Sequence, residues 1–382
     1  MEEFFNKTKV YFGKEPLKYL EKVANDRSLI VADPFLVESG MIEKITQYLQ
    51  KDKYKIFSHV VPDPPMELVV EGIQVVEEYN PHQIIAVGGG SAIDEAKAIS
   101  YFAEKMDKKE GDLTKRKRTF IAIPTTSGTG SEVTSFAVIT DKEKGVKYPL
   151  VAEELKPDIA ILDVELVSSV PAKIVADTGM DVLTHALEAY VSSKANEFTD
   201  ALAQKAALLV LQYLVPSYED KENTKAREMM HYASCLAGMA FDETSLGLNH
   251  AIAHNIGGKF HIPHGRANEV LLPHVIEFNA RIKDYQQKEF SVAAQKYAAL
   301  AAMAGFGGAN IRGAVMNLIH RIQKMQKQLK MPVNFRECGI SMTDFRKEED
   351  TIVAGALQDT CILTNPCEVT ESDIRGILKK AM

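Results

Sequence analysis

The sequence predicts a two-domain protein in which an α/β domain precedes an all-helical domain. Two observations carry this prediction. In residues 1–172, short apolar runs alternate with helix-like segments, which is the pattern of a mostly parallel sheet covered by helices. In residues 173–382, strand-like runs vanish, and Ala- and Leu-rich segments with helical spacing follow one another.

Each element is predicted from its own local pattern. Four continuous runs rich in β-branched residues end at turn-forming residues and predict buried strands, at 28–33, 83–88, 120–124 and 158–163. The segments expected to form helices beside them are 17–23, 37–50, 66–78 and 92–103. In the second part, helices are expected at 177–193, 199–215, 225–241, 246–257, 268–282, 288–305, 309–330 and 342–357.

Composition bounds the class of protein. The 382 residues are 46% hydrophobic and carry a net charge of −7, which argues against nucleic acid and against an anionic membrane surface as partners. The charged segment 105–118 is therefore expected to be a solvated loop. The pattern of a secretory signal and a long apolar run are both missing, so we expect a cytoplasmic protein. Its four cysteines form no CxxC pair and are expected to be free thiols.

The strongest chemical signal lies in two histidine-bearing stretches. Asp181 and His185 are four residues apart, so on a helix both side chains point to one face. His250 and His254 repeat this spacing, and His264 follows in a Pro-His-Gly break that can turn its side chain back toward a helix pair. A single pair of this kind is usually structural, but the combination favours a divalent metal site. Three imidazoles and a carboxylate suit Fe(II), Zn(II), Co(II) or Ni(II).

Two loops rich in Gly, Ser and Thr each follow a predicted strand. Residues 88–91 are Gly-Gly-Gly-Ser and open a predicted helix, where Ser91 and Asp94 resemble a capping pair. Glycine lets backbone N–H groups approach a ligand, and a helix N-terminus attracts phosphate. Alone, this loop fits a plain tight turn equally well. Because residues 124–131 form a second such loop after a neighbouring strand, the pair favours nucleotide binding at one sheet edge.

Asp33 ends the first predicted strand and precedes Pro34. On the local sequence, it is favoured as a turn-forming residue at a strand end. An acidic side chain at this position can also accept hydrogen bonds from a ribose and repel a 2′-phosphate, which would favour NAD over NADP.

Taken together, these motifs resemble the iron-containing alcohol dehydrogenase family over residues 8–380. The segments that carry the resemblance are 88–97, 124–134, 177–188 and 247–265. The resemblance implies the dehydroquinate synthase-like fold of that family. It has an N-terminal dinucleotide-binding α/β domain at 1–172, an all-α metal-binding and catalytic domain at 173–382, and a site in the cleft.

The resemblance also implies roles for individual residues. The implied metal ligands are Asp181, His185, His250 and His264, with Fe(II) as the metal and Zn(II) in some relatives. The positions implied to bind NAD(H) are Asp33, Gly89, Gly90, Ser91, Thr125, Thr126, Ser127, Thr129 and Lys147. His254 is implied to help proton transfer and Phe241 to line the substrate pocket, whereas His261 matches no ligand and is expected to be structural.

The implied reaction is reversible hydride transfer between NAD(H) and a small primary alcohol/aldehyde pair. Residues 147–150 and 363–366 resemble the 1-propanol dehydrogenases of propanediol utilisation, which implies propionaldehyde and 1-propanol, a homodimer or higher homo-oligomer, and association with a bacterial microcompartment. Two alternatives are a dehydroquinate-synthase-like lyase that uses NAD and zinc, and a non-catalytic nucleotide-binding assembly protein. The apolar surroundings of Phe241 favour a small aliphatic substrate over the polyhydroxy acid of the lyase. The intact ligand set argues against the assembly protein.

Overall fold

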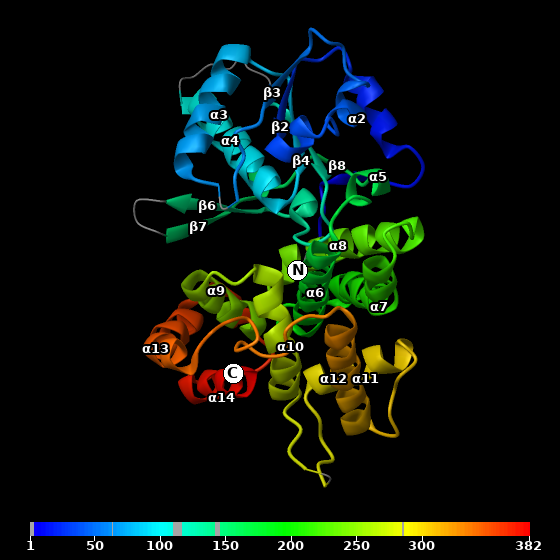
Figure 1. The fold of residues 1–382 in the computed structure, drawn as a ribbon, viewed down its shortest axis with the longest axis vertical. Helices are drawn as coiled ribbons and strands as arrows, with labels where there is room; N and C mark the ends of the chain where they lie inside the picture. Colours follow the sequence, from blue (N-terminus) through cyan, green and yellow to red (C-terminus); the bar gives the residue numbers. More distant parts are fainter. Residues whose placement is uncertain (1–3, 63, 110–116, 142–145, 285) are drawn as a thin grey trace. The chain divides into compact units, whose positions relative to one another are not determined.

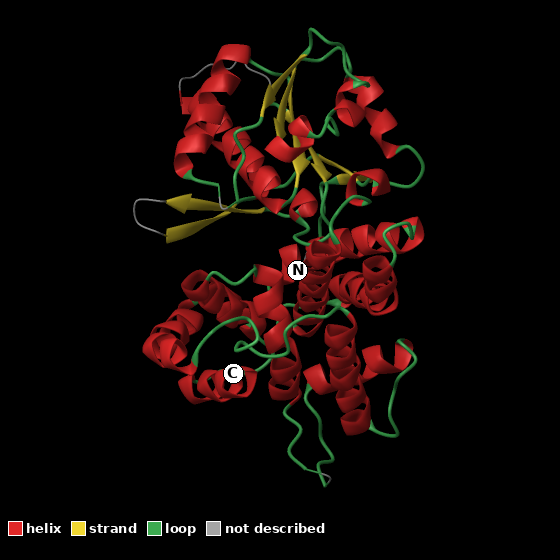
Figure 2. Cartoon of the chain, in the orientation of Figure 1, coloured by secondary structure: helices red, strands yellow, loops and turns green. Residues whose placement is uncertain are grey.

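The computed structural model describes residues 4–62, 64–109, 117–141, 146–284 and 286–382 (Figure 1). The chain forms two compact units, Met1–Val170 and Pro171–Met382. The first contains the strands and the second is helical (Figure 2). No helix in the described ranges has both the length and the apolar character that crossing a membrane requires.

The first unit is built on a six-stranded parallel sheet, as far as the described residues show. Its order is β1 (Lys9–Tyr11), β8 (Ile159–Ile161), β5 (Thr119–Pro124), β4 (Gln83–Gly88), β2 (Ser28–Ala32) and β3 (Tyr54–Phe57). A separate antiparallel hairpin pairs β6 (Phe136–Asp141) with β7 (Val146–Val151). From β2 the chain first adds β3 on one side and then β4 on the other, so the strand order reverses at β2 and β4.

Helices cover both faces of this sheet (Figure 1). On one side lie α3 (Met66–Tyr79) and α4 (Gly90–Lys109), and on the other η1 (Pro16–Val23), α1 (Pro34–Glu38), α2 (Glu43–Thr46) and α5 (Val164–Val167). The short turns η2 (Ser131–Val133) and η3 (Glu153–Leu155) follow β5 and β7. Alternation along β2 supplies both cores, because Leu29 packs on the α3 and α4 side while Ile30 packs on the opposite side. Burial on both faces explains why the central strands are continuous apolar runs.

Several local predictions for this unit were wrong. The strands β1, β3, β6 and β7 were not predicted; β1 and β3 are short, partly exposed edge strands with weak apolar runs. Residues 37–50 do not form one helix, because the chain turns at Gly40 with a φ of +76° between α1 and α2. The charged segment was predicted to be a loop from residue 105, but α4 continues to Lys109. Residues 110–116 lie outside the described residues.

The second unit confirms the eight predicted helices. They are α6 (Ala172–Val191), α7 (Glu197–Glu219), α8 (Thr224–Thr244), α9 (Leu248–Phe260), α10 (His264–Ala280), α11 (Val292–Met303), α12 (Ile311–Gln328) and α13 (Met342–Gln358). The short η4 (Thr360–Thr364) and α14 (Glu371–Ala381) were not predicted. One apolar core joins α9, α10, α13 and α14, and it includes Leu248, Ile256 and Val270. This core holds α9 and α10 against each other.

Candidate functional site

The four candidate metal ligands converge within the helical unit. Asp181 and His185 lie one turn apart on α6, His250 lies in the first turn of α9, and His264 is the first residue of α10. Each residue offers one ligand atom, and these atoms all lie within 4.8 Å of one another. His264 therefore reaches the cluster from a helix start that follows Pro263.

The spacing of these atoms fits one divalent ion. Asp181 Oδ1 lies 3.8 Å from His250 Nε2 and 3.6 Å from His264 Nε2. Ligands at ordinary metal–ligand distances around a tetrahedral ion would be about 3.4 Å apart. The rings of His185 and His250 are stacked with their centroids 4.7 Å apart, so both imidazoles enter the cluster side by side.

Burial favours the neutral form of His250, which is the form that binds a metal. Asp181, His185 and His250 are buried, whereas the His264 side chain is 43% exposed. Burial, and then the neighbouring histidines, hold the pKa of His250 well below its usual value. A metal binds neutral imidazole, so this donor set fits a divalent cation such as iron or zinc.

Two further buried polar side chains contact the candidate ligands. Glu188 Oε2 lies 2.5 Å from His250 Nδ1, and Asn268 Nδ2 donates to Asp181 Oδ1 at 2.7 Å. Burial raises the pKa of Glu188, and the hydrogen bonds that it accepts from the backbone N–H groups of Asn249, His250 and Gly247 oppose this shift. Neither Glu188 nor Asn268 was predicted. Glu188 had a sequence signal, because it continues the helix face of Asp181 and lies seven residues further on.

His254 lies one turn beyond His250, outside the group of four ligand atoms. Its ring is nearly parallel to that of His264, with centroids 5.3 Å apart. Its Nδ1 pairs with Asp359 Oδ2 at 2.8 Å, and its side chain is 40% exposed. Although burial alone would raise the pKa of Asp359, the hydrogen bond from His254 and its charge lower it. Asp359 thus orients this imidazole, a partner that sequence reasoning missed.

Two further aromatic residues were considered from the sequence. The Phe241 ring, on α8, lies 4.6 Å from the His185 ring, so an apolar surface adjoins the candidate ligands. His261 caps the C-terminus of α9 in the left-handed region, with a φ of +53°, and its side chain is exposed. The structure gives His261 this helix-ending position and does not include it in the cluster.

In the first unit, the candidate coenzyme residues gather at one edge of the sheet. Asp33 follows β2, Gly88 ends β4 and Thr125 follows β5. These three strands are adjacent and parallel. Their carboxyl ends meet where the strand order reverses, the usual ligand position in open α/β sheets. Asp33 also caps α1 by accepting from the Phe35 N–H at 2.9 Å, so the turn-forming role is present.

The two loops touch each other through their glycines. A Cβ added to Gly89 would lie 3.4 Å from Thr126 Oγ1, and one added to Gly90 would lie 2.7 Å from Thr129 Cγ2. The approach at Gly90 is too close for any real Cβ, so glycine is required there by contact rather than by its backbone angles. Ser91 lies in the first turn of α4, and Ser127 lies between Thr126 and Thr129 in the second loop.

A buried network behind the second loop corrects one prediction. Asp94 was expected to form a capping pair with Ser91, but it accepts from Ser131 Oγ at 2.6 Å and from the Val138 N–H at 3.0 Å. Since α4 already begins at Gly90, Ser91 is not its cap. Asp94 instead ties the start of α4 to the second loop and to β6.

Two buried ionisable side chains, Lys97 and Glu132, lie beside this network. Lys97 Nζ donates to the carbonyl oxygens of Thr134 and Phe136, both at 2.8 Å. Burial raises the pKa of Glu132 to about 7, with Lys97 opposing the shift. Lys147 lies on β7, and its side chain is outside the described residues.

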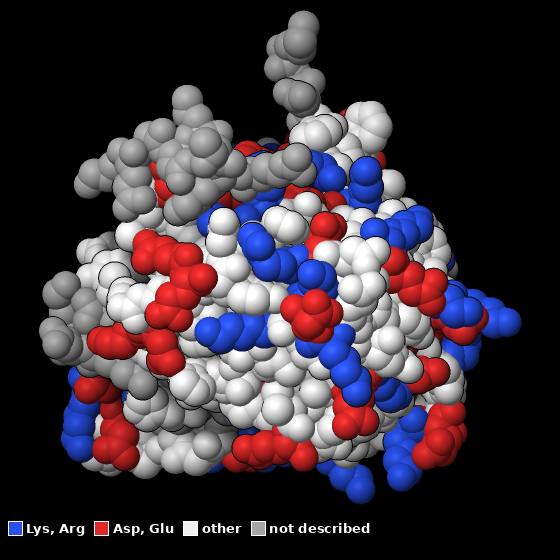
Figure 3. All heavy atoms as spheres, turned by 90° about the horizontal axis from the view of Figure 1, so that it is seen from above, with Lys and Arg blue, Asp and Glu red and all other residues white. Residues whose placement is uncertain are grey.

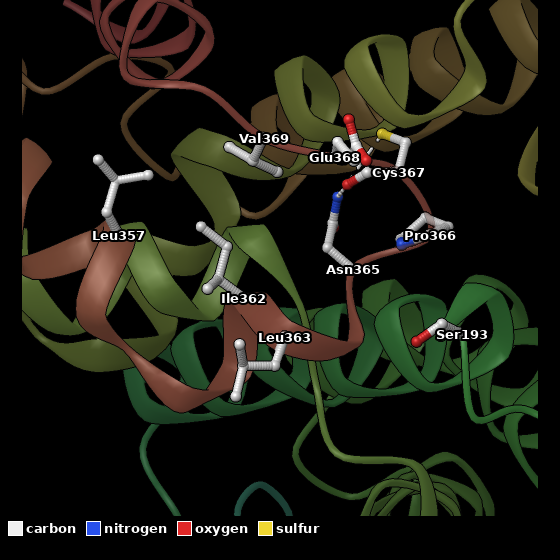
Figure 4. Close-up of a pocket in the computed structure, with 9 residues that line it drawn as sticks. All are labelled: Ser193, Leu357, Ile362, Leu363, Asn365, Pro366, Cys367, Glu368 and Val369. Atoms are coloured by element: carbon white, nitrogen blue, oxygen red, sulfur yellow. Dashed lines mark hydrogen bonds between the residues drawn. The ribbon is translucent and has the colours of Figure 1, made fainter.

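Other surface features lie apart from these groups. A hollow of about 460 Å³ is formed largely by the segment that follows α13 (Figure 4). Its lining residues are Ser193, Leu357, Ile362, Leu363, Asn365, Pro366, Cys367, Glu368 and Val369. None of the four candidate ligands lines it, so it is distinct from the cluster. On the face shown in Figure 3, basic and acidic side chains are interspersed.

Comparison with known proteins establishes the family. Residues 7–164 match the family model for iron-containing alcohol dehydrogenase, and residues 175–382 match that for the C-terminal part of the Fe-containing alcohol dehydrogenase family. The chain belongs to the iron-containing alcohol dehydrogenase family, and its fold is the one predicted from the motifs.

Three relatives indicate where in the family it lies. The 1-propanol dehydrogenase of Salmonella typhimurium is 44% identical over the full length of both chains. The NADPH-dependent butanol dehydrogenase of Clostridium saccharobutylicum is 38% identical over 97% of this chain and 95% of its own. The crystal structure of a 1,3-propanediol oxidoreductase superposes with a TM-score of 0.88 at 33% identity over both whole chains. These matches favour an alcohol dehydrogenase over the lyase and the assembly protein.

Proposed function

We propose that this enzyme reversibly transfers a hydride between NAD(H) and a small primary alcohol/aldehyde pair, with propionaldehyde and 1-propanol as its substrates. The observation that carries the proposal is the convergence of Asp181, His185, His250 and His264 beside an apolar ring. Full-length similarity to a 1-propanol dehydrogenase supports the substrate class.

The chain's residues have separate tasks in this reaction. The four ligands would hold iron, or zinc, which supplies a Lewis acid for the substrate oxygen, while NAD(H) supplies or accepts the hydride. His254 moves the proton: Asp359 holds its Nδ1, which leaves Nε2 to exchange a proton with substrate or water. An imidazole suits this role because its ordinary pKa is near neutrality.

The apolar ring of Phe241 beside the candidate ligands supports a small aliphatic substrate. Phe241, on α8, is partly exposed and packs beside His185. A polyhydroxy acid would require several charged or hydrogen-bonding groups in the same place. This surface therefore supports the alcohol dehydrogenase reaction over the lyase reaction.

The proposal divides the tasks between two domains, with coenzyme binding in residues 1–172 and metal binding and catalysis in residues 173–382. Gly89, Gly90 and Ser91 would contact the pyrophosphate through backbone N–H groups at the start of α4. The ribose would lie near Asp33, whose carboxylate favours NAD(H). The other coenzyme contacts proposed are Thr125, Thr126, Ser127, Thr129 and Lys147.

Similarity to a 1-propanol dehydrogenase also supports two proposals about assembly. The enzyme would act as a homodimer or a larger homo-oligomer, and it would operate in the cytoplasm inside a propanediol-degrading microcompartment. Light scattering on the purified enzyme tests the first proposal. Co-purification with intact microcompartments of the source cell tests the second.

A single coenzyme and substrate panel tests the proposed reaction. Oxidation of NADH and NADPH would be followed with acetaldehyde, propionaldehyde, butyraldehyde and lactaldehyde, on metal-stripped enzyme and on enzyme reconstituted anaerobically with Fe(II) or Zn(II). The expected result is metal-dependent oxidation of NADH, fastest with propionaldehyde. Equal or faster use of NADPH would contradict the role of Asp33, and absence of turnover with every aldehyde would contradict the proposed function.

A further inference from the structure

The carboxylate of Glu188 has no role in the proposed reaction, although it is buried beside the four candidate metal ligands. It extends from α6 to the first turn of α9. Its Oε1 accepts from the Asn249 N–H at 2.6 Å. Its Oε2 accepts from the backbone N–H of His250 at 3.4 Å and lies 2.5 Å from the ring nitrogen Nδ1 of the same residue. One carboxylate thus contacts both the backbone and the side chain of a single candidate ligand.

The start of α9 is adapted to this carboxylate. Gly247, its N-cap residue, contributes no side-chain cap, and its N–H also bonds to Glu188. The Leu248 N–H is accepted instead by Asn365 Oδ1 at 3.2 Å. A Cβ added to Gly247 would lie 2.9 Å from Glu188 Oε1, so glycine is what lets the carboxylate approach. The first N–H groups of α9 are therefore satisfied from other elements.

We propose that Glu188 is a positioning residue for the metal centre, which fixes the tautomer and the direction of His250. An imidazole that donates from Nδ1 to a carboxylate leaves its Nε2 lone pair available. In this structure, Nε2 of His250 lies 3.0 Å from Asn268 Nδ2 and 3.8 Å from Asp181 Oδ1, so it is the ring nitrogen that faces the other candidate ligands. Glu188 thereby pre-organises the ligand before any ion arrives. This inference rests on the proposed function, since it requires that the four residues bind a metal.

The substitution Glu188→Gln removes this effect with little change in shape. If the amide oxygen accepts from the Asn249 N–H, the amide NH₂ donates to His250 Nδ1 and forces the proton onto Nε2, which can then bind no metal. If the amide is turned around, its NH₂ meets the Asn249 N–H, and the helix start loses its acceptor. Partners that orient a metal-bound histidine typically contribute about 10–100-fold to metal affinity.

The test measures metal binding without turnover. Metal-stripped full-length enzyme would be titrated with Co(II) or Zn(II) against a competing chelator, with neither coenzyme nor substrate present. Glu188→Gln is expected to weaken binding by about 10–100-fold and to change the visible spectrum of the Co(II) form. A second variant, Gly247→Ala, leaves the carboxylate in place but obstructs its approach, and it should weaken binding in the same direction.

Two control variants distinguish the positioning of His250 from two other effects, which are the loss of any buried carboxyl group and a change at the proposed proton-transfer residue. Glu269→Gln replaces an equally buried carboxyl on α10 and should leave metal affinity within about twofold of the wild type, as expected for a substitution outside the ligand set. Asp359→Asn alters the other carboxylate–imidazole pair on α9, so it should lower turnover while metal affinity stays unchanged. Circular dichroism of each metal-free variant checks folding.

The outcomes distinguish the two proposals. If the wild type binds metal tightly and folded Glu188→Gln binds it equally well, the positioning role is wrong while the proposed function stands. If Glu188→Gln does not fold, the metal affinity of Gly247→Ala is compared with that of the wild type instead, and equal affinity makes the positioning role wrong. If the wild type itself binds no metal, or His250→Ala binds as tightly as the wild type, the proposed function fails and the role of Glu188 fails with it.

Discussion

The two units of this enzyme build their sites in different ways. At the sheet edge of the first unit, the proposed coenzyme contacts are mainly backbone N–H groups and glycines, and Gly89 and Gly90 let two loops approach each other within van der Waals contact. In the helical unit, the site consists of side chains. Asp181, His250 and His264 come from three different helices, and each is held by buried neighbours.

This difference determines how each site should respond to substitution. The loops follow adjacent strands of one sheet, so the strand ends bring them together, and each proposed contact would contribute a part of the coenzyme binding. The cluster depends on helices packed across long stretches of chain, and a metal site that loses one ligand often loses the ion altogether. We therefore expect graded effects in the first unit and large effects in the second.

The largest effect is expected from removing a ligand. His250→Ala and Asp181→Ala should lose the metal and lower kcat/KM by at least about 10³-fold, since the Lewis acid contributes several kcal/mol to the barrier. Metal analysis and NADH oxidation measure both quantities. His261→Asn, at the opposite end of α9 from His250 and outside the cluster, should retain metal and rate. Near-normal turnover in either ligand variant would show that the cluster is not the catalytic metal site.

The next effect separates catalysis from metal binding within the same unit. His254→Gln should lower kcat by about 10²–10⁴-fold, because a positioned proton donor is lost, while the metal content stays the same. Metal analysis beside steady-state kinetics checks this. Parallel loss of metal and rate would instead make His254 a ligand.

A pH-dependent effect on stability is expected in the first unit. Burial raises the pKa of Glu132 to about 7, so the folded state holds a proton that the unfolded state releases above its ordinary pKa. Stability should therefore fall as the pH rises from about 4.5 to about 7. Glu132→Gln removes this loss of stability. Its free energy of unfolding in urea, relative to that of the wild type, should therefore rise by about 2–3 kcal/mol between pH 5 and pH 8. A difference that does not change with pH would contradict the raised pKa.

The smallest effect is expected at the contact between the two loops. Gly90→Ala places a Cβ against Thr129 and should raise the KM for NADH by about tenfold, equivalent to about 1.4 kcal/mol of binding, with little change in metal content. Adding Thr129→Ser removes the obstructing methyl group and should restore part of the affinity. Gly376→Ala, on a helix with open space around it, serves as the control. An unchanged KM in Gly90→Ala would place the coenzyme elsewhere.

Much of the fold and of the site could be predicted from local patterns. Buried strands such as 83–88 are continuous apolar runs, and the helices of the second unit show strong helical spacing. Residue types and spacing indicated a metal site among Asp181, His185, His250, His254 and His264. The family resemblance implied which four are ligands, and the structure brings those four together. Short edge strands and the α1–α2 break were missed, because three or four residues carry too little periodicity to be recognised.

The sequence by itself determined which side chains are available for chemistry: imidazoles and a carboxylate at helical spacing, and glycines placed after strands. Only the tertiary structure decided how those groups are held. Glu188 and His250 are 62 residues apart, and His254 and Asp359 are 105 apart. The physical reason is that periodicity reports which face of an element is buried, whereas a hydrogen-bond partner depends on which elements pack together.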